Sequence, residues 1–139
     1  MRLKPEEFKE QLEERTLNFA VDLLTALDEL PARIILKVIV FQLAKSGSSI
    51  GANYREANRA ESKDDFVHKL SIVIKEANET VYWLSILIRL KGVPQQQHES
   101  FKPLLVEAKE LYSLFQSIGR SVRNNKAISK SPSVPPITQ

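Results

Sequence analysis

The chain has 139 residues, 42% of them hydrophobic, no cysteine and a formal net charge of +3. This length fits one domain with its own core, and the lack of cysteine excludes disulfides, thiolate nucleophiles and cysteine-bound zinc. The N-terminal segment lacks the apolar stretch of a secretory signal peptide. The longest apolar runs, residues 34–44 and 81–90, are too short and too charged to span a bilayer. We therefore expect a cytoplasmic protein without a membrane partner.

The first predicted helix begins near Pro5, because proline suits a first helical turn. It ends at Leu30-Pro31, because the α region is disfavoured before proline. Its apolar residues recur at nearly helical spacing and are Phe8, Leu12, Leu17, Val21, Leu24 and Leu27. The second predicted helix starts at Pro31, so the connection is tight and we expect the two helices to lie antiparallel.

The second predicted helix is apolar almost all round as far as Ala44, which is typical of a helix buried on more than one side. Gly47 and Gly51 follow, and each costs about 1 kcal/mol in a helix interior. Either the helix breaks here, or the glycines let another backbone come close. We favour one helix that continues to about Arg59.

The third predicted helix follows Ser62, a suitable N-cap. It ends where residues 91–94 supply a glycine cap and a proline stop. It carries two apolar lines that we do not expect to face one intramolecular core together. One line consists of Phe66, Leu70, Val73, Ala77, Val81, Leu84 and Leu87. The other consists of Val67, Ile74, Val81 and Ile88.

The fourth predicted helix starts near Ser100, has Pro103 in its first turn and continues at helical spacing to Val122. Four helices with short links predict an all-α, antiparallel, up-down-up-down four-helix bundle over residues 1–122. Residues 123–139 are rich in Ser, Pro and Asn and have no acidic residue. We expect them to form a disordered basic tail.

Two kinds of short motif in the sequence are similar to motifs that serve in catalysis or metal binding. Residues 47–51 match G-x-S-x-G, the nucleophile elbow, which needs a preceding strand and a distant His–acid pair. No segment predicts a strand, so close helix packing is the favoured interpretation. Asp65-x-x-His68 and Gln95-x-x-His98 only approach the Glu-x-x-His pairs of di-iron bundles, and the second is expected in a loop. We expect no metal, no cofactor and no enzymatic activity.

Asn53 and Glu56 lie one turn apart beside the apolar face of the second helix. Buried polar groups need hydrogen-bond partners, and the candidates are Tyr54, Lys69 and Glu79. A structural network that fixes helix register is the favoured interpretation. A polar functional pocket is the alternative.

Basic side chains gather on the second helix and towards the C-terminus. Those on the second helix project within about a third of its circumference. The set consists of Arg33, Lys37, Lys45, Arg55, Arg59, Arg120, Arg123 and Lys126, with Lys130 farther along. Two interpretations are open: a solvated face partly paired with the acidic first helix, or a stripe that binds nucleic-acid phosphates.

Residues 46–84 resemble the signature of the four-helix-bundle family named after proteins encoded in 23S rRNA intervening sequences. The matching elements are Ser46, Ser49-Ile50-Gly51-Ala52-Asn53, Glu56-Ala57, Ser62, Asp65-Phe66, Lys69-Leu70, Lys75-Glu76-Ala77, Glu79-Thr80 and Tyr82-Trp83-Leu84. The resemblance extends over about residues 15–120. It implies a homopentameric barrel of bundles, which would account for the surplus apolar lines. The accessory proteins of diversity-generating retroelements look similar, and they form basic pentameric barrels that engage a reverse transcriptase and nucleic acid.

Together these observations favour a non-catalytic, homo-oligomeric scaffold that binds RNA or DNA through backbone phosphates without sequence preference. Such binding should weaken steeply with salt. The alternative is a protein-interaction module, an accessory subunit for a partner such as a reverse transcriptase, that does not itself bind nucleic acid.

Overall fold

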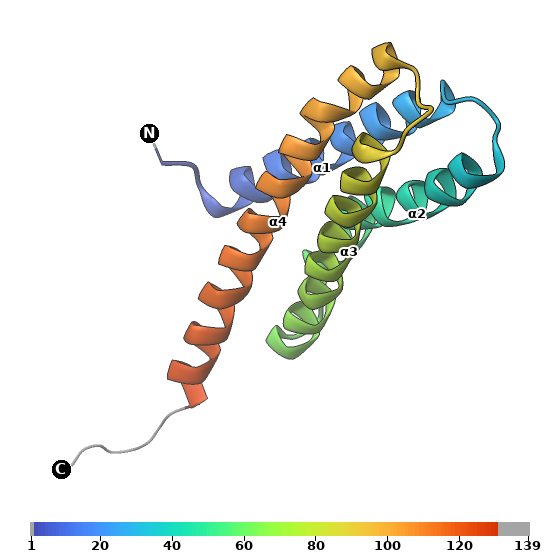
Figure 1. The fold of residues 1–139 in the computed structure, drawn as a ribbon. Coiled ribbons are helices and arrows are strands. Elements are labelled where there is room, and N and C mark those ends of the chain that lie inside the picture. The colour runs from blue at the N-terminus through green and yellow to red at the C-terminus, as the bar shows by residue number, and fades with distance from the viewer. Residues whose placement is uncertain (1, 131–139) are drawn as a thin grey trace.

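The computed structural model of the protein describes residues 2–130, with side chains as far as Asn125. Over these residues the chain forms α1 (Pro5–Asp28), α2 (Ile34–Ala57), α3 (Lys63–Arg89) and α4 (Gln95–Lys130), and no strand. Helix α3 packs against α2 and α4, and α1 also packs against α2 and α4 (Figure 1). The all-α four-helix fold predicted from the sequence is confirmed.

Local sequence signals set the starts of α1 and α3. Helix α1 begins at Pro5, as predicted. Ser62 caps α3, because the Asp65 N–H donates to Ser62 Oγ at 3.0 Å. In the link after α3, Gly92 has a φ of +91°, a conformation that glycine adopts without the steric cost of a Cβ atom.

The predicted start of the second helix is wrong by one turn. Helix α2 begins at Ile34 rather than Pro31. Residues 31–33 form the turn between the helices: the Arg33 N–H donates to the Pro31 carbonyl oxygen, and Arg33 has an extended backbone. The chain therefore leaves α1 and reverses before helical hydrogen bonding resumes.

The predicted start of the fourth helix is also wrong. Helix α4 begins at Gln95, directly after Pro94, so Pro103 lies inside the helix rather than in its first turn. A proline there removes one helical hydrogen bond. Burial of the neighbouring Phe101 and Leu104 in the core offsets this loss.

Helix α4 continues to Lys130, so residues 123–130, predicted as part of the tail, are helical. Extending an existing helix adds one hydrogen bond for each residue fixed, which costs less than starting a new helix. Residues 131–139 of the predicted tail lie outside the described residues.

Helix α2 runs without a break through Gly47 and Gly51, and α1 explains both glycines. A Cβ atom on Gly47 would lie 2.2 Å from Leu23 Cδ2. A Cβ atom on Gly51 would lie 2.9 Å from Thr16 Oγ1 and 3.4 Å from the Thr16 carbonyl carbon. The prediction of one helix is confirmed, and close packing of α1 is the reason for both glycines: Gly47 makes room for side chains of α1, and Gly51 also meets its backbone.

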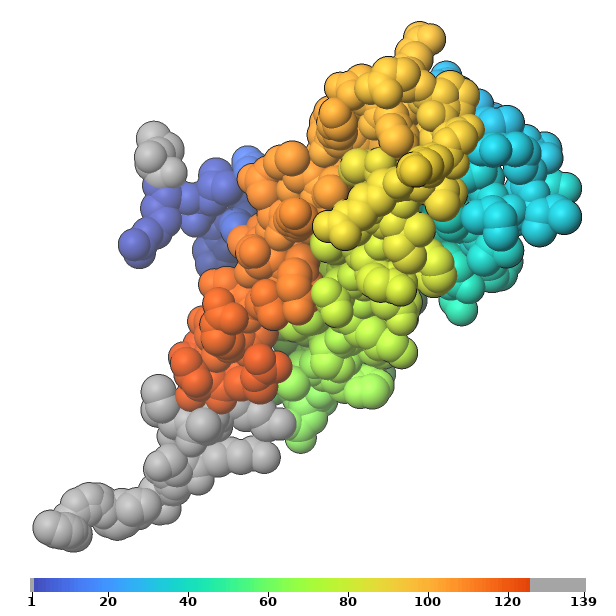
Figure 2. All heavy atoms as spheres, viewed as in Figure 1, coloured from blue at the N-terminus to red at the C-terminus, as the bar shows by residue number. Residues whose placement is uncertain are grey.

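Both apolar lines of α3 are accommodated within the chain. Leu70, Val73 and Leu84 of the first line are fully buried, and Ile74 and Ile88 of the second are partly buried against the same core. Figure 2 shows α3 and α4 packed along each other on the visible face. The expectation that one chain cannot cover both lines is wrong, because α3 has a neighbour on each of two sides.

The exposed apolar surface lies on α1 and α2 instead. We call its main part the α1/α2 face, made of Leu17, Val21, Leu24, Ile34, Val38 and Phe41, which are between 41% and 80% exposed. Among the large hydrophobic side chains described on α3 and α4, only Tyr82 and Val106 are exposed. The excess of apolar surface predicted on the second helix is therefore confirmed, whereas the exposed apolar surface on α1 was not predicted.

Helix α2 is long and apolar enough to cross a membrane by length and composition alone. Its Leu36, Ile39, Leu43 and Ile50 are buried against the other helices. One side of α2 therefore belongs to the core of the bundle.

Candidate nucleic-acid interface

The predicted basic stripe on α2 has members in different environments. Arg33 Nη2 donates to the Gly92 carbonyl oxygen at 2.6 Å, so it ties the α1–α2 link to the α3–α4 link. Lys37, Lys45 and Arg55 are exposed, and within the described residues their side chains make no hydrogen bond or ion pair. The stripe is therefore not one uniform surface.

Apolar side chains interrupt the stripe over the first half of α2. Lys37 lies among Ile34, Val38 and Phe41, each of which is more than half exposed. Apolar neighbours do not stabilise a bound phosphate, whereas a second apolar surface packed against them would be stabilised by its burial. Only the C-terminal half of α2 has the character expected of a phosphate-binding surface.

The structure brings the C-terminal parts of α2 and α4 to the same end of the bundle. The Tyr54 and Phe115 rings meet edge to face with centroids 5.1 Å apart. Gly119 of α4 lies against Ile74 of α3, and Figure 1 shows this part of α4 beside the start of α3. The exposed arginines here, which we call the arginine end, are Arg55, Arg59, Arg120 and Arg123. The side chains of Lys126 and Lys130 lie outside the described ones.

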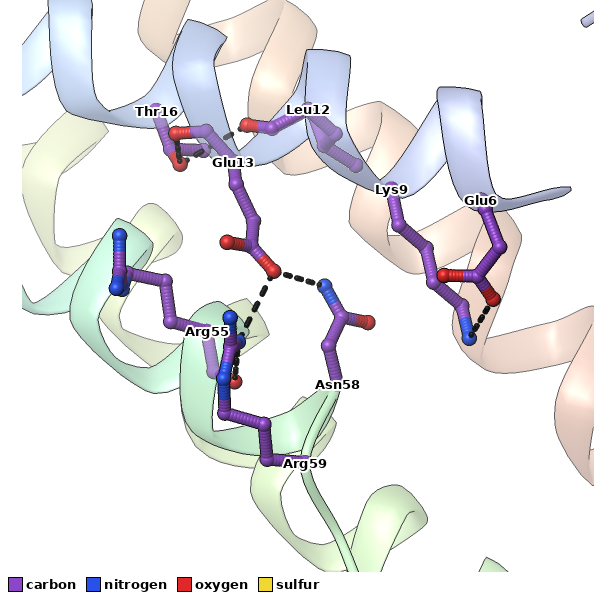
Figure 3. A network of polar contacts seen from close by, with 8 residues as sticks. All are labelled: Glu6, Lys9, Leu12, Glu13, Thr16, Arg55, Asn58 and Arg59. Atoms are coloured by element: carbon purple, nitrogen blue, oxygen red, sulfur yellow. Dashed lines mark hydrogen bonds and ion pairs between the residues drawn. The ribbon is translucent and has the colours of Figure 1, made fainter.

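Arg59 is paired with a carboxylate of α1. The Glu13 side chain, 18% exposed, accepts hydrogen bonds from Asn58 Nδ2 at 2.8 Å and from Arg59 Nη1 at 3.2 Å (Figure 3). Burial raises the pKa of Glu13, but the hydrogen bonds from Asn58 and Arg59 and the charges of Arg59 and Arg55 outweigh burial, so this pKa lies below its usual value. Glu13 therefore holds a negative charge at the arginine end.

The predicted network of Asn53, Glu56, Lys69 and Glu79 is only partly formed. Lys69 Nζ lies 3.7 Å from Glu56 Oε1 and joins α3 to α2, but Glu56 is mostly exposed. The Asn53 amide donates to a carbonyl one turn earlier in its own helix. Glu79 makes no hydrogen bond or ion pair with the described residues. Projecting a helix along its axis shows on which side of the helix a residue lies, but not how deeply other helices bury that residue.

The polar side chains of the described residues that are buried as a whole carry hydroxyls: Thr16, Ser46 and Thr80. Thr80 Oγ1 lies 3.0 Å from Ser46 Oγ across α2 and α3, and Thr16 Oγ1 donates to the Leu12 carbonyl oxygen at 2.9 Å. Both threonines are completely buried. The sequence signal was a small polar residue at a core position of the helical repeat, which the sequence reasoning did not use.

A second ion pair missed by the sequence reasoning joins α1 to α4. Arg15 donates from Nε and Nη2 to the two carboxylate oxygens of Glu107, each at 2.7 Å. These hydrogen bonds raise the pKa of Arg15 despite its partial burial. Arginine and carboxylate separated by ninety-two positions give no local pattern in the sequence.

The G-x-S-x-G segment lies entirely within α2, so no strand precedes it. Ser48 Oγ and Ser49 Oγ donate to the carbonyl oxygens of Ala44 and Lys45 one turn earlier, as hydroxyls inside helices often do. His68 is exposed, and His98 lies in α4 rather than in the expected loop. No group of three His, Asp or Glu side chains in the described part of the chain could hold a metal.

Two hollows lie on either side of Arg55. The α2/α3 hollow, of about 490 Å³, is lined by Ala52, Arg55, Glu56, Arg59 and Lys69. The α1/α2 hollow, of about 420 Å³, is mainly apolar and is lined by Glu13, Thr16, Leu17, Ala20, Val21, Leu24, Ser48, Gly51, Ala52 and Arg55. The first suits an anion and the second suits an apolar group.

Comparison with known proteins places the chain in a family. Residues 9–121 match the model for 23S rRNA-intervening sequence proteins. The chain belongs to the 23S rRNA-intervening sequence protein family. A similar solved structure is that of a protein of unknown function from the S23 ribosomal protein family of Bacteroides thetaiotaomicron VPI-5482. It is 38% identical, with a TM-score of 0.66 and coverage of 81% of this chain and 97% of that chain. No functionally curated protein matches.

Membership of the 23S rRNA-intervening sequence protein family confirms the resemblance found in residues 46–84 and fixes the fold. The matched range includes Arg55, Arg59 and Arg120, whereas Arg123 follows it. Because the Bacteroides relative is described as a protein of unknown function, function has to be inferred from the surface of this chain.

Proposed function

We propose that this 23S rRNA-intervening sequence protein is a non-catalytic, cytoplasmic scaffold that assembles with copies of itself and binds RNA or DNA through backbone phosphates. In the proposed assembly the helices run up-down-up-down, and the copies close into a pentameric ring. The observation that carries the proposal is the α1/α2 face. Soluble monomers seldom expose large contiguous apolar patches, and contact with a second copy would remove this one from water.

The arginine end supports the nucleic-acid part of the proposal. It combines exposed arginines from α2 and α4, and residues 120–130 carry four basic and no acidic side chains. Arginine and lysine bind phosphates through charge and hydrogen bonds, without reading the bases. Repetition of this end around a ring would add the potentials of all copies.

Mass measurement by light scattering tests the assembly. We expect a particle of about five times the 15.8 kDa of one chain. A particle with the mass of one chain at high dilution contradicts the ring, because the α1/α2 face would then be stable in water.

Gel shifts at low salt test phosphate binding. We expect wild type to bind single-stranded and duplex oligonucleotides of unrelated sequence, with affinity that falls steeply as salt rises. The double variants Arg55→Glu with Arg59→Glu, and Arg120→Glu with Arg123→Glu, should each weaken binding. Absence of binding by wild type contradicts the proposal.

The matched control for these variants is Arg89→Glu with Lys91→Glu. Both residues are exposed and lie at the end of α3 that is away from the arginine end. The charge changes by the same amount, so an equal loss in the control would show that total charge rather than the arginine end governs binding.

The second candidate function is a protein-interaction module without nucleic-acid binding. The α1/α2 hollow favours it, because Leu17, Val21 and Leu24 there could receive an apolar side chain of a partner such as a reverse transcriptase. The ratio of absorbance at 260 and 280 nm of the purified protein, before any nuclease step, separates the two. Bound nucleic acid raises the ratio, whereas a low ratio with a co-purifying polypeptide favours the interaction module.

A further inference from the structure

The α2/α3 hollow joins three cationic side chains that sequence reasoning had assigned to different roles. Arg55 comes from the last turn of α2, Arg59 from the link that follows α2, and Lys69 from α3. Lys69 was predicted as part of a structural network, yet it lines the same hollow as the two arginines. Cations from two separate helices around one cavity make a better-defined anion site than a stripe along one helix.

Carboxylates of the protein already form ion pairs with two of these three cations. Arg59 is held by Glu13 at 3.2 Å, and Lys69 lies 3.7 Å from Glu56 and 3.6 Å from Asp65. The Arg55 side chain has no hydrogen bond or ion pair within the described residues. Without a ligand the hollow is therefore neutralised by its own acids, and an incoming anion meets Arg55 first.

The glutamate on Arg59 comes from α1, outside the lining of the hollow. Figure 3 shows Glu13 reaching from α1 towards Asn58 and Arg59, with Arg55 one turn earlier on α2. Arg59 Nη1 also donates to the Arg55 carbonyl oxygen at 2.8 Å. The Arg59 side chain remains 61% exposed, so the rest of its guanidinium can contact a ligand if the glutamate yields. Asn58 would keep its hydrogen bond to Glu13 during that exchange.

We propose that the α2/α3 hollow is a phosphate pocket for a nucleic-acid backbone, in which Arg55, Arg59 and Lys69 contact one phosphodiester and Glu13 competes with it for Arg59. This inference rests on the proposed function and adds where one phosphate is bound and which residue limits its affinity. Glu13 is here a competing anion that keeps binding weak and dependent on salt.

The decisive experiment compares Glu13→Gln with Glu14→Gln in gel shifts with a 20-nucleotide single strand at several salt concentrations. Both variants change the net charge equally, and Glu14 is exposed without a hydrogen bond or ion pair in the described part of the chain. We expect Glu13→Gln to bind about two- to five-fold more tightly than Glu14→Gln, because one partly exposed ion pair no longer competes. Equal affinities overturn the role of Glu13.

Lysine variants test the pocket itself. Lys69→Ala should lower the slope of log affinity against log salt by about one, the value expected for one lost phosphate contact. Lys63→Ala, an exposed lysine six positions earlier on α3, should change it less. If both variants behave alike, the pocket is overturned.

Two further outcomes separate the pocket from the proposed function. Binding that depends only on Arg120 and Arg123 overturns the pocket and leaves the proposed function in place, whereas no binding by wild type overturns both. Inorganic phosphate serves as competitor against chloride of equal ionic strength. Moderately stronger displacement by phosphate supports a pocket for backbone phosphates, and equal displacement by the two salts overturns the pocket. Displacement by phosphate at concentrations that barely change the ionic strength overturns the backbone as ligand in favour of free phosphate. If Glu13→Gln fails to fold, Glu56→Gln replaces it, and we expect it too to bind more tightly than Glu14→Gln.

Discussion

Helices α1 and α2 leave apolar side chains in water, whereas α3 and α4, of comparable apolar content, cover almost all of theirs. Each helix contacts two others, so the difference follows from how extensive those contacts are: α3 packs extensively against α2 and α4, whereas α1 makes smaller contacts with its two neighbours. Helix α3 is held between α2 and α4, so its two apolar lines are both covered. Helices α1 and α2 approach each other closely along Gly47 and Gly51, and their outer apolar side chains reach beyond that narrow contact. The α1/α2 side is therefore the side suited to self-association.

The largest expected effect comes from placing a charge on the α1/α2 face. Phe41→Glu should weaken assembly by at least about 2 kcal/mol for each contact, roughly thirty-fold in Kd, because Phe41 no longer gains from burial. Tyr82→Glu, on the exposed side of α3, should leave the mass unchanged. Light scattering of both variants checks this. Dissociation by Tyr82→Glu alone would place the interface between copies on α3 and α4 instead.

Glycine-to-alanine substitutions compare how closely α1 and α2 pack with how closely α3 and α4 pack. Gly51→Ala places a Cβ atom 2.9 Å from Thr16 Oγ1 and 3.1 Å from Thr16 Cβ. Overpacking of this kind outweighs the gain in helix propensity, so we expect a loss of about 1–2 kcal/mol in the free energy of unfolding. The Cβ atom of Gly119→Ala comes closest to the flexible end of Ile74, at 3.1 Å, and lies 3.6 Å from the Arg123 guanidinium, so this variant should be neutral or stabilising. Urea unfolding measures both, and equal losses would show that α3 and α4 are as closely approached as α1 and α2.

The ion pair between Arg15 and Glu107 links the two halves. Arg15→Ala should lower the free energy of unfolding by about 1 kcal/mol, because the pair is bidentate but partly exposed. Arg15→Lys should recover only part of this, since lysine lacks the planar fork. Thermal unfolding checks the order of the three proteins. No change with alanine would mean that α1 is held only by its apolar contacts.

The smallest effects are pH-dependent and have opposite signs in the two halves. The pKa of Glu13 is lowered, so its stabilisation is present above about pH 4.5 and is lost as pH falls through its folded value. Glu13→Gln should therefore be less stable than wild type at pH 7, by under about 1 kcal/mol, and the difference should shrink as pH falls through the folded value.

Glu76 on α3 behaves in the opposite way. Burial, and then the charge of Glu79, raise the pKa of Glu76, and its Oε1 is buried without a hydrogen bond. The folded state therefore binds its proton more tightly than the unfolded state, and stability falls as pH rises through the shifted pKa. Glu76→Gln should be slightly more stable than wild type at pH 7, a gain that disappears at low pH. Unfolding at both pH values checks the pair, and the same sign for Glu13→Gln and Glu76→Gln would contradict it.

The amino-acid sequence by itself determined the four helices, the start at Pro5, the Ser62 cap and the family. These depend on helical periodicity, on caps and on a signature that all lie within short stretches of chain. It also predicted α2 as one helix through Gly47 and Gly51.

Only the tertiary structure decided which surfaces are covered and which charges are neutralised. Periodicity places a side chain on one side of a helix but does not say how fully other helices cover that side. The exposed apolar surface expected on α2 is therefore present, whereas that expected on α3 is covered and α1 exposes apolar residues instead. Glu13 and Arg59 are forty-six positions apart, and Lys69 meets Arg55 and Arg59 only around a cavity between two helices. Electrostatic energies depend on distances through space, and those distances exist only once the helices have packed.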